Sequence, residues 1–130
     1  MFSVKIITPQ GLYKEVETSI LNVITTDGAR GVLTNHVPLV CMLDIGKMST
    51  IENDVRQEYA VNGGLLYFRN NQATILTDTC EHSSEIDVER AISAKQRAEE
   101  RIANKNPNID LQRAELALKR AMTRINVSGN

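Results

Sequence analysis

Apolar and polar positions follow two different rhythms along this chain of 130 residues. Near the start, Phe2, Val4 and Ile6 are separated by single residues, which is the alternation typical of a half-buried β-strand. Pro9-Gln10-Gly11 then provides a turn signal. After residue 84 the apolar positions instead recur at helical spacing, so we expect the chain to change from strands to helices there.

Residues 1–84 are predicted to form an all-β domain. Further segments rich in β-branched or apolar residues follow the first strand, and most have a Gly, Asn or Asp within the next two residues: 16–26, 37–45, 47–51, 55–61, 65–68 and 73–79. Gly46 and Gly63-Gly64 divide neighbouring segments, the glycine pair as a turn between strands with positive φ. Short strands with frequent turn signals predict a β-sandwich or flattened barrel rather than a Rossmann-like parallel sheet.

Residues 85–130 are predicted to form a helical hairpin. Small apolar residues recur three or four positions apart on two segments: Ala91, Ala94 and Ala98, then Ala114, Leu118, Ala121 and Ile125. The first helix should reach about residue 104, with Ser84 or Asp87 at its start. A short breaker follows, in which Pro107 suits the first turn of the second helix and Asn106 its cap. Such a short connection permits only an antiparallel return.

Each helix also carries a basic row with a step of seven and then four residues: Arg90, Arg97 and Arg101 on the first, Arg113, Arg120 and Arg124 on the second. This step keeps the side chains on one helical face. The commoner explanation of such a row is a solvated face that pairs with nearby glutamates. The alternative is a docking face for an acidic partner or ligand.

Composition and charge exclude several functional classes. The chain is 42% hydrophobic and 24% charged, as in a soluble domain with a modest core. Residues 1–84 hold six Lys/Arg against nine Asp/Glu (−3), and residues 85–130 hold nine against seven (+2), too small an excess for a nucleic-acid binder. Cys41 and Cys80 lie singly in apolar runs, and no Cys/His cluster occurs, so no metal site is predicted.

No catalytic residue is predicted either, because no nucleophile–base pair is visible. The chain begins directly in a strand pattern without a leader, and no apolar run approaches the ~20 residues that span a bilayer. These features predict a soluble protein of a cytoplasm-like, reducing compartment.

Five segments, in order along the chain, resemble the epsilon subunit family of F-type ATP synthases in its bacterial form: 8–11 (TPQG), 26–40 (TDGARGVLTNHVPLV), 59–66 (YAVNGGLL), 86–91 (IDVERA) and 113–121 (RAELALKRA). The resemblance implies a β-sandwich of about ten strands followed by a mobile two-helix hairpin. It also implies a non-catalytic subunit that regulates and couples a proton-translocating rotary ATP synthase from its central stalk.

The partners that the resemblance implies are the gamma subunit, the c subunits of the rotor ring and the catalytic alpha and beta subunits. The implied location is peripheral, at the cytoplasmic face of the bacterial cell membrane, and the isolated chain is expected to be a monomer. The rotor-ring contact would be made by Ala29, Arg30, Gly31 and Val32. The family usually has an acidic residue near Ala29 or Arg30 and a Pro-Gly pair where this chain has Thr34-Asn35, so Arg30 is expected to reverse the charge of that contact.

Within the family, Ile-Asp-x-x-Arg-Ala marks versions that bind ATP between the closed hairpin and the sandwich. By position, the implied ligand groups are Glu81, Ile86, Asp87, Arg90, Ala91, Arg97, Arg120 and Arg124. ATP would be a regulatory ligand and not a substrate, because the chain has no GxxxxGK[ST] loop and no acidic pair placed to hold magnesium. No cofactor is required.

The resemblance further implies that the extended hairpin inhibits ATP hydrolysis, with Arg113, Arg120 and Arg124 facing an acidic segment of the catalytic subunits. A free-standing nucleotide-sensing or adaptor module is the alternative function. Copurification separates the two, because only a stalk subunit should isolate together with gamma and the catalytic head.

Overall fold

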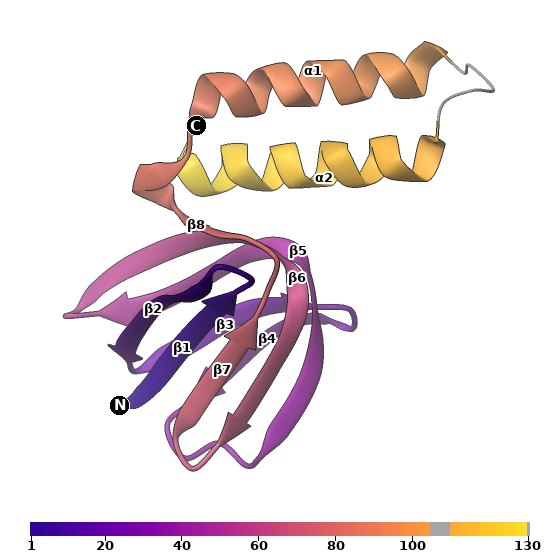
Figure 1. Cartoon of the computed structure of the whole chain (residues 1–130). Coiled ribbons are helices and arrows are strands. Elements are labelled where there is room, and N and C mark those ends of the chain that lie inside the picture. The colour runs from indigo at the N-terminus through magenta and orange to yellow at the C-terminus, as the bar shows by residue number, and fades with distance from the viewer. Residues whose placement is uncertain (105–109, 130) are drawn as a thin grey trace.

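The computed structural model describes residues 1–104 and 110–129, and it places a β-sandwich beside a hairpin of two helices, as the sequence predicts (Figure 1). The strands are β1 (Phe2–Thr8), β2 (Gly11–Thr18), β3 (Ile20–Thr25), β4 (Gly28–Leu33), β5 (Leu39–Glu52), β6 (Val55–Arg69), β7 (Gln72–Leu76) and β8 (Cys80–His82). They follow the order β2-β1-β7-β6-β5-β3-β4, with β8 paired to β6. Only β1 and β7 pair in parallel among these described strands.

The described part of the chain has eight strands instead of about ten, because β5 and β6 are long and continuous. The expected divisions at Gly46 and Gly63-Gly64 lie inside these strands. Residues 59–61 of β6 pair with β8, whereas residues 65–69 pair with β7. Gly63 (φ 72°) and Gly64 (φ 118°) bend the strand between these halves. The glycine pair therefore redirects one strand and does not connect two.

The core fills the space between the sandwich layers. Its large buried side chains include Phe2, Ile6, Leu21 and Phe68, and the rings of Phe2 and Phe68 meet edge to face at 5.4 Å. Tyr59 is also fully buried, and its hydroxyl donates to Glu52 Oε2 at 2.7 Å. The sandwich thus has its own packed interior, independent of the helices.

The hairpin consists of α1 (Val88–Asn104) and α2 (Leu111–Ser128). Asp87 caps α1 by accepting the Arg90 N–H at 3.1 Å, which confirms Asp87 over Ser84. Helix α2 begins at Leu111 with Asp110 as its cap, later than Pro107 suggests; Asn106 and Pro107 themselves lie outside the described residues. The most buried residues between the helices are alanines, as predicted: Ala91, Ala98, Ala114 and Ala121.

Helix α2 lies between α1 and the sandwich (Figure 1) and contacts β5 and β6. Ala60, Ile86 and Val127 form a small apolar cluster at this contact. Polar contacts accompany it: Lys119 Nζ lies 2.6 Å from Asp44 Oδ2, and Arg120 Nε donates to Asn62 Oδ1 at 2.9 Å. The apolar cluster is small, so the hairpin is held on the sandwich by little buried area and a few exposed or partly buried polar contacts.

Candidate functional site

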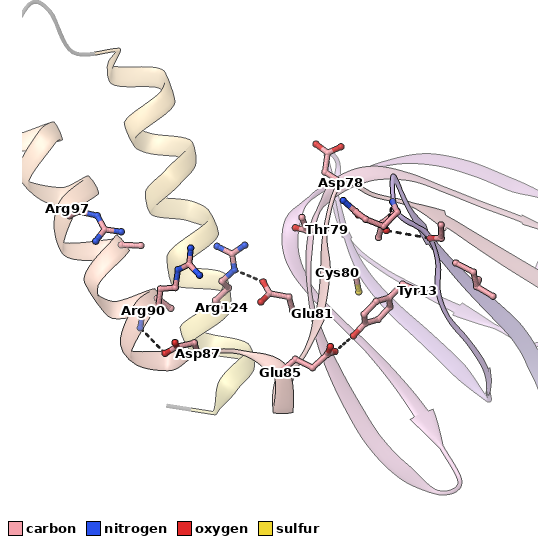
Figure 2. Close-up of a pocket in the computed structure, with 16 residues that line it drawn as sticks. Tyr13, Asp78, Thr79, Cys80, Glu81, Glu85, Asp87, Arg90, Arg97 and Arg124 are labelled. Atoms are coloured by element: carbon pink, nitrogen blue, oxygen red, sulfur yellow. Dashed lines mark hydrogen bonds and ion pairs between the residues drawn. The ribbon is translucent and has the colours of Figure 1, made fainter.

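A pocket of about 860 Å³ lies between the hairpin and the sandwich (Figure 2). Its walls come from α1, from α2, from the turn between β1 and β2, and from the segment that runs from β7 through β8 to α1. This volume is within the ~300–1,000 Å³ of ordinary small-molecule sites. Because both domains contribute walls, the pocket exists only while the hairpin lies on the sandwich.

Three arginines line the helical side of the pocket. Arg90 and Arg97 are two turns apart and share one face of α1, and Arg124 comes from α2. The Arg124 Nε donates to Glu81 Oε1 at 2.6 Å, an ion pair that joins α2 to β8. Guanidinium groups from two helices therefore line one volume (Figure 2), an arrangement that suits phosphate or carboxylate groups.

Carboxylates line the other parts of the pocket: Asp78, Glu81, Glu85 and Asp87. Glu81 is paired with Arg124, and Asp87 is occupied in capping α1. Glu85 accepts the His82 N–H at 3.0 Å. The cations thus lie on the two helices, whereas the carboxylates lie on the sandwich and at the start of the hairpin. This separation suits a ligand with one anionic end and one hydrogen-bonding end.

Tyr13 of β2 connects the sandwich to the start of the hairpin at the edge of this pocket. Its hydroxyl donates to Glu85 Oε1 and accepts the His82 N–H at 3.0 Å. Burial, followed by the Glu85 hydrogen bond, raises the pKa of Tyr13 well above its usual value, so the hydroxyl stays a donor. The Tyr13 hydrogen bond, followed by that of the His82 N–H, lowers the pKa of Glu85.

Six of the eight ligand groups implied by the resemblance line the pocket: Glu81, Asp87, Arg90, Ala91, Arg97 and Arg124. Ile86 and Arg120 do not. Ile86 is buried against Ala60 and Val127, and Arg120 bonds Asn62 beside a separate, much smaller hollow. Arg120 lies one helical turn before Arg124, so its Nε reaches Asn62 of β6, whereas the Nε of Arg124 reaches Glu81 of β8.

The three arginines of the expected inhibitory contact are not presented together in this conformation. Arg113 is exposed in the first turn of α2. Arg120 and Arg124 are only partly exposed and bond the sandwich. An acidic partner therefore has full access to one member of the row while the hairpin is closed.

The residues expected at the rotor ring form most of β4, which pairs with β3. Ala29, Arg30 and Gly31 are exposed, whereas Val32 is fully buried in the core. Of the four expected contact residues, Ala29 to Gly31 are therefore accessible to a partner, and Val32 anchors them to the sandwich.

Sequence reasoning missed several residues of the pocket, including Tyr13, Asp78, Thr79 and Glu85. Glu85 carried a usable signal, because it stands three residues after His82 and completes a capping box there. Tyr13 had none, since its two partners follow it by 69 and 72 positions in the chain.

Two further features are absent from residues 1–104 and 110–129, a metal-binding cluster and a membrane-spanning helix. No group of three or more His, Cys, Asp or Glu side chains in these ranges could hold a metal ion. Over the same residues, neither helix has the length and apolar character needed to cross a membrane.

Comparison with known proteins covers nearly the whole chain. A family model for the β-sandwich domain of the ATP synthase delta/epsilon chain matches residues 1–83, and a model for the long α-helix domain of the same chain matches residues 84–129. The ATP synthase epsilon chain of Halalkalibacterium halodurans is 42% identical, with 97% of this chain and 96% of the relative covered. The ATP synthase epsilon chain of Bacillus pumilus is 43% identical, with 97% of this chain and 95% of the relative covered.

A chain in the cryo-EM structure of the Euglena gracilis mitochondrial ATP synthase (OSCP/F1/c-ring, rotational state 1) has the same fold, with a TM-score of 0.84 at 18% identity. The superposition covers 98% of this chain and 80% of the other. With both domain models matched in order and relatives above 40% identity along its length, the chain belongs to the ATP synthase delta/epsilon chain family.

Proposed function

We propose that the chain is the regulatory and coupling subunit of the central stalk of an F-type ATP synthase, and that it has no catalytic activity of its own. In this proposal the sandwich connects the gamma subunit to the rotor ring. The hairpin binds ATP when closed and inhibits ATP hydrolysis when extended. The observation that carries the regulatory part is the pocket itself, because arginines of both helices reach it only in the closed hairpin.

ATP fits the separation of charges in this pocket. Its triphosphate would lie against Arg90, Arg97 and Arg124, since guanidinium–phosphate pairs form strong bidentate hydrogen bonds. Its base and ribose would lie toward Glu81 and Asp87, which can accept hydrogen bonds from an amino group or hydroxyls. Phosphate contact would release Arg124 in part from Glu81, so that one ligand touches both helices and the sandwich.

The coupling role has support in an apolar patch on the outer surface of the sandwich. Met42 of β5 lies opposite Leu65 of β6, which lies opposite Leu76 of β7. Val40 stands two residues before Met42 on the same face. These four side chains are 40–72% exposed, and such contiguous apolar patches are typical of protein interfaces. We assign this patch to gamma and the exposed part of β4 to the rotor ring.

Inhibition would follow from release of the hairpin. When α2 leaves the sandwich, Arg120 and Arg124 lose Asn62 and Glu81 and become available, together with Arg113, to an acidic surface. Because the same arginines serve the closed and the extended state, ATP and the catalytic subunits would compete for them. High ATP would thereby favour the non-inhibitory conformation.

Titration of the purified subunit with ATP tests the regulatory part. Ligand linkage predicts that ATP stabilises the chain by roughly 2.7 kcal/mol at a hundredfold excess over Kd, and that ADP binds more weakly because it lacks a phosphate. If millimolar ATP gives no heat of binding in calorimetry and no shift in melting temperature, the chain is not an ATP sensor. Copurification tests the coupling role: substitution of Met42 and Leu65 by Asp should abolish recovery with gamma, whereas Leu33→Asp, also exposed, should not.

A further inference from the structure

The segment between the sandwich and α1 is fastened on two sides. Strand β8 pairs with β6, with His82 opposite Tyr59, and the rings of these two residues meet edge to face at 5.2 Å. His82 Nε2 also lies 2.6 Å from Oε1 of Gln57, another residue of β6. From the other side, Tyr13 bonds both the His82 N–H and Glu85. Residues up to Glu85 are therefore held as part of the sandwich.

The hydrogen bonds of this fastening stop at Glu85, and Ile86 beyond it packs against Ala60 of β6 and Val127 of α2. The short 3-10 helix η1 (Ser83–Glu85) is closed by two hydrogen bonds, because Glu85 Oε1 accepts the His82 N–H and His82 Nδ1 accepts the Ser84 N–H at 3.1 Å. Ile86 follows in an extended conformation (φ −80°, ψ 125°), and Asp87 already caps α1. Residues 86 and 87 thus form the short connection between a fixed turn and the first helix of the hairpin.

We propose that Tyr13 is a positioning residue for the pocket, which holds Glu85 and His82 so that the hairpin turns about Ile86 and Asp87. The proposal rests on the proposed function, in which the pocket binds ATP. With the turn fixed, α1 returns to one position at each closure. Asp87, the cap of α1, and Arg90 in its first turn are then already in position when the ligand binds.

Tyr13 matters for the order of this segment because β8 is short. Three residues of strand give few backbone hydrogen bonds, so the Tyr13 contacts contribute a large part of the order in this segment. Loss of the hydroxyl leaves the Glu85 carboxylate without its side-chain donor. The population of correctly placed η1 falls, and the apparent Kd for ATP rises in inverse proportion to that population.

Hydrogen exchange of the ligand-free subunit tests the fastening directly. Tyr13→Phe should speed exchange of the amides of residues 80–86 by roughly three- to tenfold, the effect of losing about one hydrogen bond. Tyr67→Phe is the matched control, because it removes the hydroxyl of an exposed strand tyrosine for which the described residues provide no side-chain hydrogen bond. Equal exchange in the two variants would overturn the proposal.

ATP titration tests the link to the pocket. Tyr13→Phe should raise the Kd for ATP by up to the factor by which it speeds exchange, because the Kd follows the ordered fraction of the segment and exchange follows the ratio of open to ordered forms. Tyr67→Phe should leave the Kd unchanged. A faster exchange with an unaltered Kd would overturn the positioning role. If the unsubstituted subunit binds no ATP, the proposed function fails, and exchange alone then decides whether Tyr13 fastens the segment.

Two substitutions of Glu85 distinguish positioning from direct ligand contact. Glu85→Gln keeps a side-chain oxygen that accepts from Tyr13 and from the His82 N–H, so its exchange and its Kd should stay within about twofold of the unsubstituted subunit. Glu85→Ala removes the acceptor of both hydrogen bonds and should lose at least as much as Tyr13→Phe does. Equal losses in the Gln and Ala variants would mean that the carboxylate charge itself binds the ligand, which contradicts the proposal.

Discussion

The Arg124 guanidinium donates to Glu81 Oε1 at 2.6 Å and so joins α2 to β8 within the pocket. The two side chains are 34% and 32% exposed, and an ion pair of this kind contributes only ~0–1 kcal/mol. A phosphate that bonds Arg124 together with Arg90 and Arg97 would hold the hairpin more firmly than this pair does. The closed hairpin is therefore poised to respond to a ligand of the pocket.

Arg90→Ala should weaken ATP binding by about 1.5–3 kcal/mol, the contribution of a charged hydrogen bond, or roughly ten- to hundredfold in Kd. Arg101→Ala is the matched control, because Arg101 belongs to the same basic row of α1 but does not line the pocket. Calorimetric titration of both variants gives the comparison. An equal Kd in the two variants would show that the row acts only through its overall charge.

The inhibitory contact can be separated from ATP binding through Arg113, which is exposed and does not line the pocket. Arg113→Ala should relieve part of the inhibition of ATP hydrolysis in the assembled enzyme while leaving the Kd of the isolated subunit unchanged. Substitution of Arg113, Arg120 and Arg124 together should relieve it fully. Inhibition by the unsubstituted chain should also weaken as salt rises, since the contact is electrostatic. An unchanged hydrolysis rate in the triple variant would contradict this mechanism.

The change from strands to helices and the alanine seam could be predicted from the sequence, because both depend on local periodicity. The same periodicity predicted that Arg90 and Arg97 share one face of the first helix and that Arg124 belongs to a basic face of the second, and all three line the pocket. It could not place Arg120, because a face of α2 extends past several strands, and only three-dimensional packing decides that Arg120 meets Asn62 while Arg124 meets Glu81.

The number of strands and the role of Tyr13 could not be predicted from local sequence patterns. Glycine weakens a strand in general, so Gly46 and Gly63-Gly64 indicated breaks, yet cross-strand pairing carries β5 and β6 through these positions. Tyr13 reaches Glu85 only because β2 and the β8 segment meet in space. Contacts between residues so distant in sequence leave no periodic signal.

The ion pair between Lys119 and Asp44 should make hairpin docking sensitive to acid. The Lys119 hydrogen bond lowers the pKa of Asp44 below its usual 3.8, so the pair stabilises docking above that pH and is lost as pH falls through the lowered value. Lys119→Ala should cost no more than about 1 kcal/mol at neutral pH. Its difference from the unsubstituted chain should shrink as the pH falls below 3.8 and vanish once Asp44 is protonated in the folded chain.

Thermal melts followed by the helical circular dichroism signal measure this difference. Lys95→Ala is the control, because Lys95 lies on α1 and forms no ion pair among the described residues. A gap between Lys119→Ala and the unsubstituted chain that persists in acid would assign the effect to packing of the lysine stem instead of its charge.

Gly64 should be the least replaceable glycine of the sandwich. It has φ +118°, and a Cβ there would lie 1.8 Å from the carbonyl oxygen of Leu76, a contact that backbone atoms cannot relieve by small shifts. Gly11 has a similar φ of +113° but open space around it. Gly11→Ala should therefore cost only the conformational strain of about 1–2 kcal/mol, whereas Gly64→Ala should cost at least about 3 kcal/mol and separate β6 from β7. Chemical denaturation of both variants measures the two losses, and equal losses would show that φ alone, and not the approach of β7, requires glycine at this bend.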